Sequence, residues 1–176
     1  MANRLVTLRS LPLLAATCLL LAGCFQSSEP KFPLADAAAP LGEGGRYSLY
    51  ERESDNRYQR QEAVVIKRRS DGAYDFIDEK GETQTVSFHA LGEDLFVGQA
   101  KADKDLPGYG YAVLRMAGGE AVVYVPQCDA QDKAALSASG VEVNGQLECI
   151  IDRVRDTAGL FKRLALGQPV SKLVRE

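Results

Sequence analysis

Short segments in which apolar and polar residues alternate recur along most of this sequence, and they restrict it to a largely antiparallel sheet. Successive side chains of a β-strand point to opposite faces, so such alternation indicates a strand with one buried face. In Thr83 to Leu91, for example, Val86, Phe88 and Ala90 share a face. We predict seven strands of this kind, at residues 47–50, 62–69, 74–78, 83–91, 95–101, 109–116 and 121–125.

Turn residues separate these segments at short intervals. The Asp71-Gly72 pair favours a tight hairpin because glycine adopts the positive φ angles of such turns at no steric cost, and Gly118-Gly119 favours another. A meander of seven strands curls and closes to remove its exposed edges. The predicted fold class is therefore mainly β, of the α+β type: an antiparallel meander that forms a curled sheet or a small β-barrel.

The last 50 residues favour one or two helices behind this meander. Residues 129–139 are rich in alanine and end before Gly140, which suits a short helix closed by a glycine. Asp156 and Thr157 can cap a second helix, which Gly167 would stop. We expect the second helix to cover the open end of the sheet or one of its faces.

The first 23 residues have the composition of a secretory signal peptide. Arg4 and Arg9 are basic, and residues 11–21 form an apolar run. That run is shorter than the ~20 consecutive apolar residues needed to cross a bilayer. We therefore predict a cleaved signal peptide over residues 1–23.

The end of this segment, Leu21-Ala22-Gly23-Cys24, resembles the lipobox of bacterial lipoproteins. The resemblance implies that the Cys24 thiol carries a diacylglyceryl group and that the chain is cleaved before Cys24, so the mature protein is attached to a membrane by lipid. In such lipoproteins an aspartate directly after the cysteine favours the inner membrane. Phe25 stands there in this chain, so the resemblance implies the periplasmic face of the outer membrane, with the inner membrane as the alternative.

Residues 24–44 are expected to form a tether between the lipid and the domain. Pro30, Pro33 and Pro40 fall in this stretch together with a run of alanines, a composition that buries little apolar surface. A proline-rich chain of this length reaches ~60 Å when it is extended. A single β-rich globular domain then follows over residues 45–176.

Apart from Cys18 of the leader and the lipidation candidate Cys24, the chain has two cysteines, Cys128 and Cys149. An even pair in an oxidising compartment predicts a structural disulfide. The alternatives are a redox pair or a metal site. A redox pair of the thioredoxin type would need a Cys-x-x-Cys motif, and a metal site would need more histidine and cysteine than the chain has, so we predict no metal and no cofactor.

His89 is the only histidine, and alternation places it with Thr85 and Ser87, opposite Val86 and Phe88. A serine and a histidine on one strand face suggest a nucleophile and its base. Such a pair also needs an orienting carboxylate and an oxyanion hole, and the sequence has no Gly-x-Ser-x-Gly turn. We expect His89 to be a solvated or hydrogen-bonded strand residue and the protein not to be an enzyme.

Three tyrosines, Tyr109, Tyr111 and Tyr124, fall in neighbouring predicted strands around the Gly118-Gly119 turn. Cross-strand aromatic packing is one explanation of this set. The other is a binding face for a ligand or partner, to which His89 would also belong.

The chain has a formal charge of −3, which argues against nucleic acid as a partner. The sequence thus predicts a lipid-anchored, periplasm-facing module that binds, or interacts structurally with, an envelope protein or glycan. The alternatives are an enzyme that acts on the cell wall or envelope glycans and a small inhibitor of an envelope hydrolase.

Overall fold

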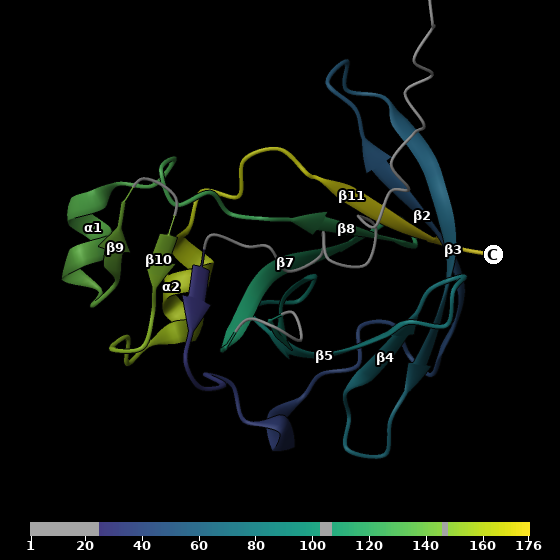
Figure 1. Cartoon of the computed structure of the whole chain (residues 1–176), viewed down its shortest axis with the longest axis horizontal. Coiled ribbons are helices and arrows are strands. Elements are labelled where there is room, and N and C mark those ends of the chain that lie inside the picture. The colour runs from purple at the N-terminus through teal and green to yellow at the C-terminus, as the bar shows by residue number, and fades with distance from the viewer. Residues whose placement is uncertain (1–24, 103–106, 146–147) are drawn as a thin grey trace, which may run out of the picture.

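The computed structural model describes residues 25–102, 107–145 and 148–176, and eight antiparallel strands of these residues close a barrel (Figure 1). Around the ring, each strand is hydrogen-bonded to the next and the last returns to the first. In this order they are β2 (Gly44–Arg52), β3 (Tyr58–Arg68), β4 (Tyr74–Ile77), β5 (Thr83–Ala90), β6 (Leu95–Lys101), β7 (Tyr109–Ala117), β8 (Glu120–Tyr124) and β11 (Ser171–Arg175).

The mainly β prediction is confirmed, and of its two forms the structure has the closed barrel. All seven predicted strands are present as β2 to β8, and the turns at Gly72 and Gly118-Gly119 have the positive φ angles that favour glycine. The eighth strand, β11, was not predicted. It lies between β2 and β8, so the meander alone does not close the ring.

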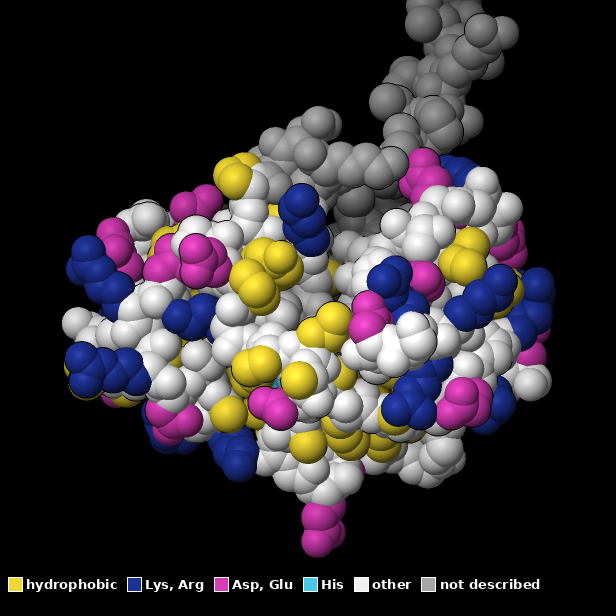
Figure 2. All heavy atoms as spheres, turned by 90° about the horizontal axis from the view of Figure 1, so that it is seen from below, with side chains coloured by type: hydrophobic (Ala, Val, Ile, Leu, Met, Phe, Trp, Pro, Cys, Tyr) yellow, Lys and Arg dark blue, Asp and Glu magenta, His cyan; other side chains and the backbone are white. Residues whose placement is uncertain are grey.

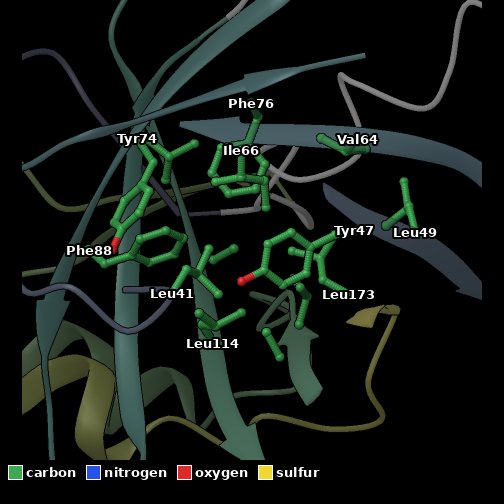
Figure 3. Close-up of a cluster of buried hydrophobic side chains, with 14 of the residues drawn as sticks. Leu41, Tyr47, Leu49, Val64, Ile66, Tyr74, Phe76, Phe88, Leu114 and Leu173 are labelled. Carbon is green, nitrogen blue, oxygen red and sulfur yellow. The ribbon is translucent and has the colours of Figure 1, made fainter. Parts of the chain in front are cut away.

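The inside of the barrel is a hydrophobic core (Figure 3). Side chains at alternate strand positions fill it, as Ala112 and Leu114 of β7 do, and Leu41 joins them from the segment before β2. Other members shown in the close-up are Tyr47, Ile66, Tyr74, Phe76, Phe88 and Leu173.

A smaller subdomain packs on the outside of the barrel. It contains β1 (Phe25–Ser27), α1 (Lys133–Ala138), β9 (Glu142–Asn144), β10 (Glu148–Ile150) and α2 (Thr157–Arg163). β1 pairs with the start of β7 on one side and with β10 on the other, which extends the sheet away from the barrel. The ring of Phe161 in α2 lies 5.4 Å from that of Tyr111 in β7, so α2 covers an outer face of the barrel. Of the two expected positions for this helix, the open end of the sheet and one of its faces, the structure has the second.

Residues 25–44 do not form the expected tether. Phe25 is fully buried in β1, and Phe32 and Leu41 are buried further on. Between β1 and β2 lie residues 28–43, here called the strap. The strap crosses the outside of β6 and β5, includes the 3-10 helix η2 (Leu34–Asp36), and then brings Leu41 into the barrel core. Proline lowers the entropy lost when a chain docks, so a few well-placed apolar residues are enough to hold the strap against the barrel.

No helix among the described residues is both long and apolar enough to cross a membrane.

Candidate functional site

A concave site lies at the end of the barrel where β2 ends and β11 begins. There Val170, just before β11, accepts a hydrogen bond from the Arg52 N–H and donates one to the Val123 carbonyl oxygen, each at 2.9 Å. The β2–β3 hairpin extends past this end of the barrel (Figure 1). Together, the hairpin and the two connectors beside it enclose a groove of about 530 Å³.

The groove has an apolar floor and a polar rim. Leu49, Val125, Leu166, Pro169 and Val170 supply much of the apolar lining, and none of the residues that line the groove is aromatic. The polar lining residues are Glu51, Arg52, Glu53, Ser54, Gln127, Gln168 and Ser171. A groove of this size is within the range of small-molecule sites, ~300–1,000 Å³, and its lining suits a ligand with an apolar body.

Gln131 holds two walls of the groove together. Its Nε2 atom donates to the carbonyl oxygens of Gln127 and Ala165 at 3.0 and 2.9 Å, and its Oε1 atom accepts from the Ala165 N–H at 2.9 Å. The connector after β8 and the segment after α2 are therefore linked by a single side chain. This arrangement forms the groove before any ligand arrives, which reduces the ordering cost of binding.

Carboxylates concentrate at the same end of the barrel. Burial raises the pKa of Glu62, and the negative charges of Asp78, Glu79 and Glu51 raise it further, against a smaller opposing effect of Lys80. Glu79 also accepts a hydrogen bond from the Ala63 N–H at 3.0 Å, which keeps its charge beside Glu62. Several carboxylates therefore lie close together near the mouth of the barrel.

Tyr111 does not belong to an exposed binding face, because its side chain is fully buried. Its hydroxyl lies 2.6 Å from Ser27 Oγ, which donates to the Glu29 carbonyl oxygen at 2.6 Å. Burial raises the pKa of Tyr111 to about 12, against the opposing effect of the hydrogen bond with Ser27. Tyr111 thus links β1 to the barrel, and its side chain does not contribute to an exposed face.

His89 is likewise buried, at 4 % exposure, under the strap. Its Nε2 atom lies 3.2 Å from Ser87 Oγ, so the predicted pairing of these two side chains on one strand face is confirmed. The Phe32 ring stacks on the imidazole at a centroid distance of 5.0 Å and covers it. The pair is therefore inaccessible to a substrate in this structure, and it does not form a binding face with the tyrosines.

Tyr109 and Tyr124 are partly buried and pack against the outer hydrophobic cluster. The Arg115 guanidinium lies over the Tyr124 ring, 5.7 Å from its centroid. Both side chains thus pack on the outer hydrophobic cluster, and Tyr124 also contacts a cation of the neighbouring strand.

Cys128 and Cys149 form the predicted disulfide, with their Cα atoms 5.8 Å apart. Among the residues that the structure describes, no three His, Cys, Asp or Glu side chains form a group that could hold a metal ion. The predicted lipidation site, Cys24, lies outside the described residues.

The sequence did not reveal the groove. Its lining comes from the end of β2 and from two connectors distant in the chain, none of which carries a recognisable motif. The one available signal was Gly167 and Pro169, which mark an irregular segment after α2 but do not indicate what that segment encloses.

The face seen from below carries acidic and basic side chains in a mixed pattern near its rim, with hydrophobic side chains gathered nearer its middle (Figure 2). Such mixing on this face produces no extended field of one sign, in contrast to the basic surfaces of nucleic-acid-binding proteins.

Comparison of this chain with protein-family models, with curated proteins and with solved structures finds no match.

Proposed function

We propose that this chain is a lipid-anchored protein of the bacterial envelope that faces the periplasm and binds an amphipathic ligand in the groove at the mouth of its barrel. The observation that carries the binding role is the groove itself, with its aliphatic floor and its charged rim. The anchor rests on the lipobox-like residues 21–24.

The lining of the groove narrows the class of ligand. Aliphatic side chains favour an alkyl chain or aliphatic side chains of a partner, and no aromatic residue lines the groove to stack on a sugar ring. A glycan is therefore the less favoured of the two partner classes that the sequence suggested.

The charged residues at the rim indicate which charge the polar group of the ligand carries. The lining contains two carboxylates, Glu51 and Glu53, and one cation, Arg52, and the carboxylates of Asp78 and Glu79 lie near Glu62 at the same end of the barrel. A cationic head on an apolar body is stabilised by these carboxylates, whereas an anionic head is repelled. We therefore assign a cationic amphiphile, free or as a basic and apolar peptide segment.

Binding is favoured over catalysis because the one serine–histidine pair is covered. Ser87 and His89 lie beneath Phe32, and no residue that lines the groove is a histidine, cysteine or lysine. An inhibitor of an envelope hydrolase is also a binding protein. This alternative function would use the same groove and would differ only in the molecule that the groove binds.

Two probes of equal chain length and opposite charge test the proposal. We expect isothermal titration calorimetry, below the critical micelle concentrations, to show saturable binding of decyltrimethylammonium and much weaker binding of decanoate. Leu166→Arg places a charge in the floor of the groove and should abolish the binding. Glu51→Gln should reduce the preference for the cationic probe.

Leu34→Arg is the matched control, because Leu34 is an exposed leucine of η2 outside the groove. The proposal fails if Leu166→Arg binds the cationic probe as well as the wild type does, or if Leu34→Arg abolishes binding equally.

A further inference from the structure

The burial of Phe25 leaves no spacer between the lipid and the folded domain. Phe25 follows Cys24 directly, and consecutive Cα atoms are ~3.8 Å apart. β1 is paired on both sides, with Phe25 opposite Cys149 of β10 and Gln26 opposite Gly110 of β7. Since Cys149 is itself linked to Cys128, the residue next to the lipid attachment point is fixed in the sheet.

The direction of β1 indicates which surface the lipid approaches. β1 runs antiparallel to β7, with Ser27 opposite Tyr109 and Gln26 opposite Gly110. The direction from Ser27 to Phe25 in β1 is therefore the direction from Tyr109 toward Arg115 in β7. Beyond the end of β1, the edge of β7 that paired with β1 pairs with β8, beginning with Tyr124 opposite Val113.

On this part of the barrel, strand register aligns one row of outward-facing side chains. Val122 of β8 pairs with Arg115 of β7 and with Lys172 of β11, and Lys172 pairs with Tyr50 of β2, which pairs with Arg60 of β3. Side chains directly opposite one another share a face of the sheet. With strands ~4.8 Å apart, this row, here called the cationic row, is ~20 Å long.

The neighbouring sequence positions confirm that the row faces outward. Leu114, Val123, Leu173 and Leu49 flank its members along the strands, and all four point into the barrel core. The row carries three cations, one tyrosine and one valine.

Aromatic rings accompany the cations. Lys172 Nζ lies 5.6 Å from the centroid of Tyr50 and 5.0 Å from that of Tyr58, and the Arg115 guanidinium lies over Tyr124. Tyrosine and the long basic side chains are the residues that concentrate at the headgroup level of membranes, because each combines an apolar body with a polar tip.

The carboxylates near the row pair with its cations. Glu120 accepts hydrogen bonds from Lys172, Glu176 pairs with Arg60 at 3.3 Å, and Asp94 lies 3.8 Å from Arg115. The side chains of Arg115 and Arg60 nevertheless remain 42 % and 49 % exposed, so both can reach an anionic group.

We propose that this face of the barrel, the cationic row with Tyr58 and Tyr124, rests on the anionic headgroups of the membrane to which the lipid on Cys24 attaches the protein. The inference depends on the lipid anchor of the proposed function and adds a fixed orientation to it. The strap lies across the barrel from this face, because β5, on which it packs, is distant from β8 and β11 in the ring of eight strands. The strap therefore faces away from the membrane.

The chain has no tryptophan, so one introduced tryptophan reports its own environment. The lipidated protein is reconstituted in vesicles of phosphatidylcholine and phosphatidylglycerol that contain a phospholipid with a nitroxide on its headgroup. We expect the fluorescence of Tyr50→Trp, and of Tyr124→Trp as a second reporter, to be quenched. The matched control Leu34→Trp in η2 should keep its fluorescence, and in the Tyr50→Trp protein Lys172→Glu should reduce quenching.

Equal quenching of the Leu34→Trp and Tyr50→Trp reporters overturns the orientation, as does the absence of quenching at both face positions. Equal quenching of Tyr50→Trp in vesicles of phosphatidylcholine alone overturns the role of anionic headgroups. Failure of the protein to float with vesicles of either composition instead contradicts the lipid anchor, so failure of the anchor is distinguished from failure of the orientation.

Discussion

At the scale of single residues, Gln99 is the main link between the strap and the barrel. Its Oε1 atom accepts hydrogen bonds from the backbone N–H groups of Lys31 and Phe32 at 2.7 and 3.0 Å, and its Nε2 atom donates to the Phe32 carbonyl oxygen at 3.1 Å. Gln99 is 6 % exposed, so these backbone groups would lack partners without it.

Replacing Gln99 with leucine should therefore lower the free energy of unfolding by about 2–3 kcal/mol, because buried donors and an acceptor are left unpaired. Urea denaturation followed by circular dichroism measures the change. Gln59→Leu, at an exposed position of β3, is the control and should change the stability little. Equal stability of Gln99→Leu and the wild type would show that the strap is held by its apolar residues alone.

His89 should make the folded state sensitive to acid. Burial lowers the pKa of His89 below its ordinary value of 6.5, against weaker opposing effects of the Asp36 backbone and charge. The unfolded chain therefore binds the proton more readily, so the contribution of His89 to stability is complete above pH 6.5 and is lost as the pH falls from there toward the lowered pKa.

In His89→Gln this loss should be absent, so the stability of the variant should decrease less than that of the wild type between about pH 7.5 and 5.5, as measured by urea denaturation at both values. The raised pKa of Glu62 acts in the opposite direction, but it is present in both proteins and cancels in their difference. Parallel pH profiles of the two proteins would contradict the prediction.

At the scale of elements, alternation predicted β2 to β8 because each of these strands has one face in the barrel core and pairs with its neighbour in sequence. The same alternation placed His89 and Ser87 correctly on the face opposite Phe88. It did not indicate that this outer face is covered too, since the cover comes from a proline-rich segment with few apolar residues. β1 and β9 are only three residues each, too short for any period to appear.

The disulfide joins the connector after β8 to β10, the neighbour of β1. Its cysteines are 21 residues apart, and a loop of this length gives a stabilisation of ~3 kcal/mol from chain entropy. We expect the double variant Cys128→Ser, Cys149→Ser to lose about that amount in urea denaturation. The wild type with reductant should behave like the variant, and a variant as stable as the oxidised wild type would contradict the expectation.

At the scale of the whole molecule, two hydrophobic clusters share one wall. β7 contributes Ala112 and Leu114 to the inner cluster and Tyr111 and Val113 to the outer one. The sequence predicted a single domain but not this division, because the outer cluster depends on which segments meet in space. The groove was unpredictable for the same reason.

Cys24→Ala should abolish the incorporation of labelled palmitate and release the protein from the membrane fraction. The domain should still fold, because the substitution leaves the buried Phe25 and its strand unchanged. Cys18→Ala, in the predicted leader, is the matched control and should leave the labelling unchanged. Continued labelling of Cys24→Ala would contradict the anchor.

β11 fills the seam between β2 and β8, and its Ser171 pairs with Glu51, far earlier in the chain. Contacts between such distant positions form slowly, because a long loop must close before they stabilise anything. Until that strand has been made and has found both neighbours, the barrel stays open along one side. A nascent chain that lacks residues 171–175 is therefore expected to remain loosely structured, which under the proposed export to the periplasm would favour its passage through a membrane channel.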